Sequence, residues 1–94
     1  VMRHLEETLI AYRSTRAQVR RYRERILPRV REHLELIREG YQQGEFDQLK
    51  VLDAQQTLAD ARMAYLDRLS SLVDEIVKLE ELAGAPIDEF QQQE

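Results

Sequence analysis

The stretch Gly40-Tyr41-Gln42-Gln43-Gly44-Glu45-Phe46-Asp47 decides how this chain folds. Gly44 is suited to the left-handed backbone conformation that follows the end of a helix. Asp47 is a good N-cap for a second helix. Between these two signals there is room for a turn of only about three or four residues. So short a connection makes the helices on either side of it antiparallel neighbours.

The segments that flank this turn both have the apolar period of an α-helix. Their apolar residues recur at steps of three, four or seven, which predicts a single apolar seam on each helix. The seam before the turn is predicted to be Leu5, Leu9, Tyr12, Val19, Ile26, Val30, Leu34, Ile37 and Tyr41, and the seam after it Leu52, Leu58, Tyr65, Leu69, Leu72, Ile76, Leu79 and Ala83. We therefore expect an all-α fold, a coiled-coil hairpin with helices over about 2–42 and 48–83, and no strand.

Three residues are expected to modify these helices. Pro28 removes a helical hydrogen bond and clashes with the carbonyl four residues earlier, so a kink is expected near Glu24–Pro28. Gly40 lies in the last helical turn, where it costs up to about 1 kcal/mol relative to Ala and allows close packing or bending. Gly84, with a proline two residues further on, predicts the end of the second helix. We expect residues 84–94 to form a frayed tail.

The composition is typical of long helices in a single small unit. The 94 residues are 34 % charged and include only three Gly and two Pro. Cysteine is absent, which excludes disulfides and thiolate metal sites. No apolar run approaches the roughly 20 residues needed to span a bilayer. Because the helical pattern is already present at Val1, we expect residues 1–94 to be one hairpin cut from a larger protein.

Charge is divided unevenly between the two halves of the chain. Residues 1–40 contain ten Arg and six Glu, whereas residues 41–94 contain four basic and twelve acidic residues. The simplest interpretation is that the two helices face each other and partly neutralise each other's charge. A basic helix that binds nucleic acid or anionic lipid is an alternative, but acidic residues interrupt the arginines and Tyr22 is the only aromatic among them, so we expect no nucleic-acid partner.

The acidic residues Asp53, Asp60, Asp67 and Asp74 recur every seven residues and form one stripe along the second helix. Such a stripe is usually solvated or takes part in salt bridges between helices. It could also line a water-filled passage, and periodicity alone does not separate these interpretations.

Catalytic chemistry has no candidate residues in this sequence. His4 and His33 are 29 residues apart, or roughly 44 Å along a helix, so they cannot share a metal ion. No nucleophile–base set and no phosphate-binding glycine loop is present. We expect no enzyme activity, no metal and no cofactor. The aromatics Tyr41 and Phe46 at the turn either cap the hairpin core or form a docking knob, and capping is the favoured interpretation.

The stretch from Gly40 to Leu58 resembles a signature of the TolC-like outer-membrane efflux protein family. The family pattern is a tyrosine, two residues, a glycine, two residues, a small polar cap and then a Val-Leu-Asp-Ala run. In this chain Tyr41, Gly44 and Asp47 match the first part, and Val51-Leu52-Asp53-Ala54 matches the run. The family includes the outer-membrane channels of heavy-metal and drug efflux systems.

The resemblance implies much more than the periodicity does. Family members are trimers with an outer-membrane β-barrel and a long periplasmic α-barrel, so this chain would be the last helical hairpin of the α-barrel, in the periplasm. Its tip would dock the hairpin tip of a periplasmic adaptor, which links the channel to an inner-membrane pump. The matching tip positions are Tyr41, Gln42, Gln43, Gly44, Glu45, Phe46 and Asp47.

The family also narrows its periplasmic entrance with acidic residues just after the tip. Asp53 matches one of these gate positions. Where some members carry a second acid, this chain has Lys50, and a Lys50/Asp53 pair between neighbouring hairpins is the alternative to a double acidic ring.

Besides the basic-helix module considered above, one broader alternative remains at this point. The chain could be a stand-alone coiled-coil module for oligomerisation or scaffolding. Whatever its parent, a lone hairpin of this size buries little surface, so we expect it to self-associate, for example as a four-helix bundle.

Overall fold

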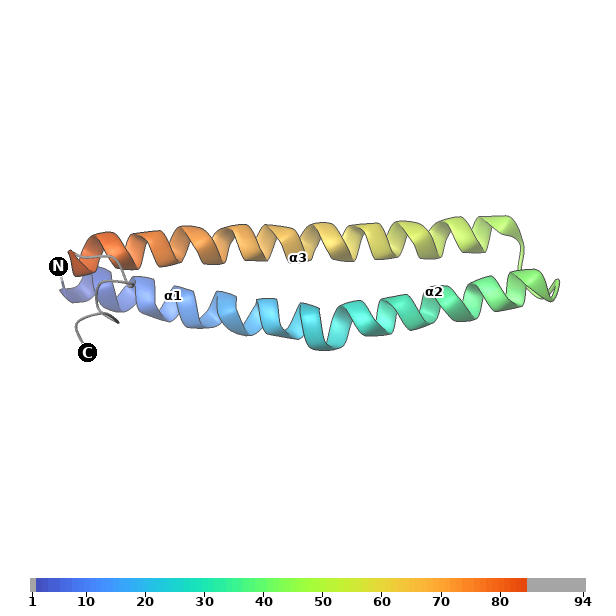
Figure 1. The fold of residues 1–94 in the computed structure, drawn as a ribbon, viewed down its shortest axis with the longest axis horizontal. Coiled ribbons are helices and arrows are strands. Elements are labelled where there is room, and N and C mark those ends of the chain that lie inside the picture. The colour runs from blue at the N-terminus through green and yellow to red at the C-terminus, as the bar shows by residue number, and fades with distance from the viewer. Residues whose placement is uncertain (1, 85–94) are drawn as a thin grey trace, which may run out of the picture.

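The computed structural model describes residues 2–84, and these form a helical hairpin 61 Å long (Figure 1). The first arm consists of α1 (Met2–Arg21), a π-helical turn η1 (Tyr22–Ile26) and α2 (Leu27–Gln42). The second arm is the single helix α3 (Gln48–Ala83). The expected all-α fold and both helix boundaries are confirmed. Gly84 ends α3 in the left-handed conformation with a φ of 80°, and the remainder of the expected tail lies outside the described residues.

The predicted kink is present, and η1 produces it. Pro28 has no amide hydrogen, and its ring would clash with the carbonyl of Glu24 in a regular α-helix. The chain relieves this clash by widening the preceding turn, so that the Leu27 amide donates to the Tyr22 carbonyl, five residues earlier. Figure 1 shows the first arm bending at this turn, with the apex of the bend pointing away from α3.

The π-helical turn also shifts the inward-facing stripe of the first arm by one residue. Before the turn the stripe runs through Thr15, Val19, Tyr22 and Ile26 in steps of four, three and four. After it the stripe starts again at Leu27 and continues through Val30, Leu34 and Ile37. The π-helical turn thus takes up one extra residue. As a result the apolar seam faces α3 both before and after this turn.

The core lies in the half of the hairpin nearest the turn. Its buried members are Leu27, Leu34, Ile37, Ala54 and Leu58, and the residues packed around them are Val30, Phe46, Val51, Ala61 and Tyr65. Towards the open end the two arms remain in contact, but fewer residues there are buried, namely Thr15 and Val19.

The predicted seam of α3 is partly wrong. The inward stripe has a strict alternation of three-residue and four-residue steps: Val51, Ala54, Leu58, Ala61, Tyr65, Arg68, Leu72, Glu75, Leu79 and Leu82. Leu52 and Ala83, which were predicted to lie in the seam, are exposed. On the first arm, Gly40 takes the buried position predicted for Tyr41, which is nearly half exposed. Near the tip two of the buried positions are small, Gly40 and Ala54, and the Phe46 ring lies directly against Gly40.

The expected neutralisation between the two arms is also wrong for the described residues. Three ion pairs form within residues 2–84, and each joins two residues of the same helix: Arg3–Glu7, Arg38–Glu35 and Arg68–Asp67. Nδ1 of His4 also lies 3.8 Å from the Glu7 carboxylate, on the same helix. The arginine-rich arm and the acidic α3 thus lie side by side without an ion pair between them in the described part of the chain. Both sets of charge remain available to a neighbouring molecule.

One polar contact crosses the interface near its open end. The buried Thr15 hydroxyl donates to Oε1 of Glu75 at 2.8 Å, while Oε2 of Glu75 is buried without a hydrogen-bond partner. Losing the Thr15 donor would leave both oxygens of this carboxylate without a hydrogen bond, which lowers the stability of the hairpin.

Replacing Thr15 with Val should therefore destabilise the hairpin by about 1–3 kcal/mol, because it leaves the whole Glu75 carboxylate unsatisfied. The double variant Thr15→Val/Glu75→Leu should recover this loss, since apolar side chains can replace a buried polar pair without penalty. Urea unfolding followed by circular dichroism measures both. A double variant as unstable as the single one would contradict this account.

Candidate functional site: the hairpin tip

The tip begins with a Schellman motif at the end of α2. The Gly44 amide donates to the Tyr41 carbonyl at 3.1 Å, and the Glu45 amide donates to the Gly40 carbonyl at 2.7 Å. This pair of bonds requires a left-handed residue just beyond the helix, and Gly44 provides it with a φ of 80°. The prediction for Gly44 is confirmed. The backbone of the turn is fixed by these bonds.

Asp47 starts the second arm as predicted. Its backbone is extended, with φ −85° and ψ 171°, and its Oδ1 accepts a hydrogen bond from the Lys50 amide at 3.1 Å. This bond satisfies one of the amides that the first turn of α3 would otherwise leave free. Both sides of the turn are thus capped by hydrogen bonds between residues that are close in the sequence.

Phe46 joins the tip to the core. Its ring lies against Gly40, so closely that a Cβ atom at position 40 would overlap Cδ2 and Cε2 of the ring. The Lys50 ammonium lies over the same ring, 4.6 Å from its centroid, in a cation–π contact. Gly40 therefore serves close packing rather than bending. Capping of the core, the favoured interpretation of the two aromatics, is confirmed for Phe46 but not for Tyr41.

The structure brings the predicted docking residues together on one exposed end. The side chains of Tyr41, Gln42, Gln43, Glu45 and Asp47 are exposed around the fixed turn, and Phe46 is partly buried beneath them. The two predicted gate residues lie next to this end. Lys50 and Asp53 share a shallow pocket with Glu45, Phe46, Asp47 and Leu49, and within the described residues they do not form an ion pair with each other.

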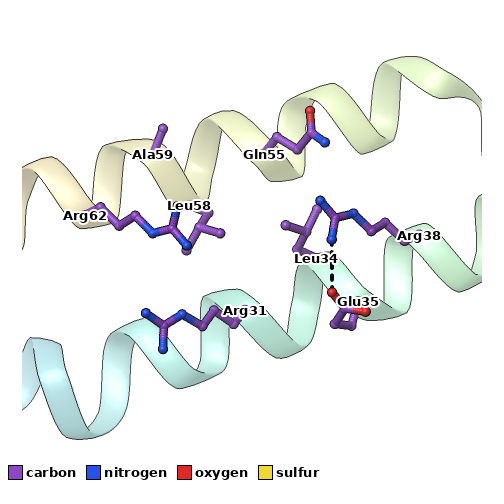
Figure 2. A pocket seen from close by; sticks show the side chains of 8 residues that line it. All are labelled: Arg31, Leu34, Glu35, Arg38, Gln55, Leu58, Ala59 and Arg62. Atoms are coloured by element: carbon purple, nitrogen blue, oxygen red, sulfur yellow. Dashed lines mark hydrogen bonds and ion pairs between the residues drawn. The ribbon is translucent and has the colours of Figure 1, made fainter.

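A second concave surface, which the sequence analysis did not predict, lies between α2 and α3 (Figure 2). Leu34, Leu58 and Ala59 are among its lining residues, together with Gln55 and Glu35. Arg31 and Arg38 reach over it from α2, and Arg62 reaches over it from α3. We call this surface the arginine groove. Arg31 and Arg38 are seven residues apart, and each directly follows a residue of the apolar seam. This pattern in the sequence could have predicted the groove.

Two further properties of the described residues bear on function. No group of three or more His, Cys, Asp or Glu side chains within residues 2–84 is arranged to hold a metal ion. None of the helices in this part of the chain is both long and apolar enough to cross a membrane.

The fold and the tip define a long coiled-coil hairpin with a capped turn at one end and an exposed polar tip. The chain belongs to the outer membrane efflux protein family, whose family model matches residues 1–85. The resemblance seen in the sequence is thereby confirmed, and the family is one of transport channels. No curated protein and no solved structure gives a significant match.

Proposed function

We propose that this hairpin is part of the periplasmic wall of a trimeric outer-membrane efflux channel, and that its tip docks a periplasmic adaptor. The observation that carries this proposal is a second apolar stripe on α3, opposite the seam that packs on the first arm. Its members are between 45 and 68 % exposed: Leu49, Leu52, Met63, Leu66, Val73 and Val77. A helix with apolar stripes on two opposite sides has a helical neighbour on each side. Every helix in the wall of an α-barrel has this arrangement.

A free-standing scaffolding module would also bury a second stripe, but it would not require the features of the tip. Here the turn is fixed by backbone hydrogen bonds, while the side chains of Gln42, Gln43 and Tyr41 remain exposed. Such a surface loses little conformational entropy when another tip docks on it. Together with the family membership, this supports the channel over the scaffold.

Opening of the channel would then follow from differential affinity. An adaptor that binds splayed tips more tightly than closed tips shifts the population towards the open state by that difference in binding free energy. Adaptors of this kind connect the channel to an inner-membrane pump. The docking surface would be the exposed part of Tyr41–Asp47.

The gate would be formed by Asp53 and Lys50 next to the tip. Asp53 is exposed, and its carboxylate has no ion-pair partner within the described residues, so it can present its charge at the entrance. Lys50 lies against the Phe46 ring, which holds its ammonium group close to the turn. Neighbouring hairpins that bring Lys50 and Asp53 together would close the entrance by charge pairing.

The test is adaptor binding and efflux by the full-length parent carrying changes at the tip. Gln43→Arg alters only a side chain, whereas Gly44→Arg also strains a backbone with positive φ. Both should abolish adaptor binding and efflux. Glu32→Arg, an exposed position on α2 about 16 Å from the tip, is the control and should leave both intact.

Asp53→Asn in the same parent separates gating from docking. It should leave adaptor binding unchanged and alter the cation selectivity of the channel in planar bilayers. Adaptor binding that persists in both tip variants would contradict the docking proposal. An unaltered selectivity in Asp53→Asn would contradict the gate.

A further inference from the structure

A stripe of four arginines runs along one edge of the first arm. Arg16, Arg23, Arg31 and Arg38 each follow directly after an inward-facing residue, so all four lie beside the seam on the same edge. Their steps are seven, eight and seven residues. The eight-residue step crosses η1, whose extra residue brings the two halves of the stripe into line.

The arginine groove is the part of this edge where α3 contributes a third cation. Arg31, Arg38 and Arg62 are all exposed and face a floor that includes Leu34 and Leu58 (Figure 2). Only Arg38 has an ion-pair partner in the described part of the chain, the Glu35 carboxylate at 3.1 Å. The groove is thus basic along its rim, while Leu34 and Leu58 at its base are only 4 % and 7 % exposed.

The acidic stripe of α3 has the same spacing as the arginines. Asp53, Asp60, Asp67 and Asp74 recur every seven residues, about 10.5 Å apart along the helix. Asp60 and Arg62 are two residues apart, so they point about 160° away from each other around α3. The acidic stripe therefore cannot reach the groove of its own hairpin, which explains why no ion pair crosses between the arms in residues 2–84.

Apolar side chains border the acidic stripe on its far side from the hairpin. Met63 lies three residues after Asp60 and four before Asp67, and is therefore next to both on the helix surface. Its side chain is 68 % exposed. This face of α3 thus combines heptad-spaced carboxylates with an unpartnered apolar side chain, which is the complement of the arginine groove.

We propose that the arginine groove is the docking site for α3 of a second copy of this chain. Asp60 and Asp67 of one copy pair with Arg31 and Arg38 of the next, and Met63, which lies between the two carboxylates, packs beside the exposed Ala59 of the groove. The acidic stripe matches the arginines in spacing as well as in charge, so a helix of a second copy fits better than an extended polyanion, which has no heptad spacing. The contact is heterologous, because it joins the groove of one copy to the acidic stripe of another. Each copy keeps one free groove or one free stripe, so further copies can bind head to tail. The proposal does not depend on the channel function.

Sedimentation velocity of the 94-residue chain tests this contact, with two charge-reversed variants. The groove variant is Arg31→Glu/Arg38→Glu, and the stripe variant is Asp60→Lys/Asp67→Lys. Each should weaken self-association at least about tenfold, because two attractions become repulsions. Higher salt should weaken the association of the unaltered chain. The control Arg21→Glu/Arg29→Glu has the same change in net charge as the groove variant, but its residues lie away from the groove, and it should associate as before.

The decisive measurement is a mixture of the groove variant and the stripe variant. The first retains an intact acidic stripe and the second an intact groove, so the mixture should form a one-to-one complex and grow no further. Circular dichroism checks that each variant is helical, and Arg31→Gln/Arg38→Gln replaces the groove variant if that variant unfolds.

Four outcomes would overturn the proposal. They are a monomeric unaltered chain, a control that weakens association as much as the groove variant, helical variants whose mixture fails to associate, and a groove that binds heparin while self-association is insensitive to the reversals.

Discussion

Replacing Leu34 or Leu58 with Ala is expected to unfold the half of the hairpin nearest the turn. Leu34 is 4 % exposed and Leu58 is 7 % exposed, and both belong to the one buried cluster that joins α2 to α3. Truncating a buried Leu to Ala removes about 2–5 kcal/mol of stability. A lone hairpin whose buried cluster has five members lies at the low end of the range of about 5–15 kcal/mol by which folded domains are stable. The expected loss is therefore comparable to the whole stability of the isolated hairpin.

The measurement is urea unfolding of the 94-residue chain followed by circular dichroism at fixed chain concentration. Leu36→Ala is the matched control, because Leu36 is on the same helix, two residues from Leu34, and is 63 % exposed. It should change the free energy of unfolding by no more than about 0.5 kcal/mol. Equal losses for Leu34→Ala and Leu36→Ala would show that the cluster does not hold the arms together.

The second large effect is expected at Gly40. Alanine is the better helix former by up to about 1 kcal/mol, so helix propensity alone predicts that Gly40→Ala stabilises the chain. We expect the opposite, a loss of about 1–3 kcal/mol, because the added Cβ would overlap the Phe46 ring and force it off Gly40. Displacing the ring would also break its contact with the Lys50 ammonium group.

A double-mutant cycle with Phe46→Ala separates the steric effect from the others. In a chain that already lacks the ring, Gly40→Ala should no longer destabilise and should return to the gain expected from propensity. Gly44→Ala provides the contrast, because no atom lies within 4 Å of its added Cβ and its penalty comes from a φ of 80°. That penalty, about 1 kcal/mol or more, should be the same with and without Phe46. A Gly40→Ala variant more stable than the parent chain would refute the packing account.

The features that the sequence predicted correctly are the local ones. A left-handed glycine and an N-cap aspartate act through bonds to residues three to five positions away, so Gly44 and Asp47 could be assigned without knowing the fold. The same is true of Pro28, whose effect falls on the turn immediately before it. These signals also fixed the helix boundaries.

The inward face of α3 could not be predicted in the same way. Two apolar stripes run along this helix, and hydrophobicity alone prefers the larger side chain of Leu52 to that of Ala54. The structure places Ala54 inside because the arms approach closely near the tip, where Gly40 and Phe46 meet. That approach depends on residues distant in sequence.

Charge was mispredicted for a related reason. The sums over the two halves suggested mutual neutralisation, but pairing depends on which edge of each helix carries the charge. The arginines from Arg16 to Arg38 and the acids from Asp53 to Asp74 occupy edges that do not meet within one hairpin. The one-residue shift at η1, which a regular heptad count does not contain, sets the edge for half of the arginines.

That shift has a mechanical consequence. Straightening η1 into a regular α-helix would rotate everything beyond it by about 100° about the axis of the arm. Leu34 and Ile37 would then turn away from α3, and the buried cluster would come apart. The bend at η1 is therefore a permanent feature of the folded hairpin and does not straighten while the cluster is intact. A movement that opens the tips while keeping this cluster intact has to carry α2 and the facing part of α3 together as one unit, so the bending falls in the half of the hairpin where fewer residues are buried, towards the open end.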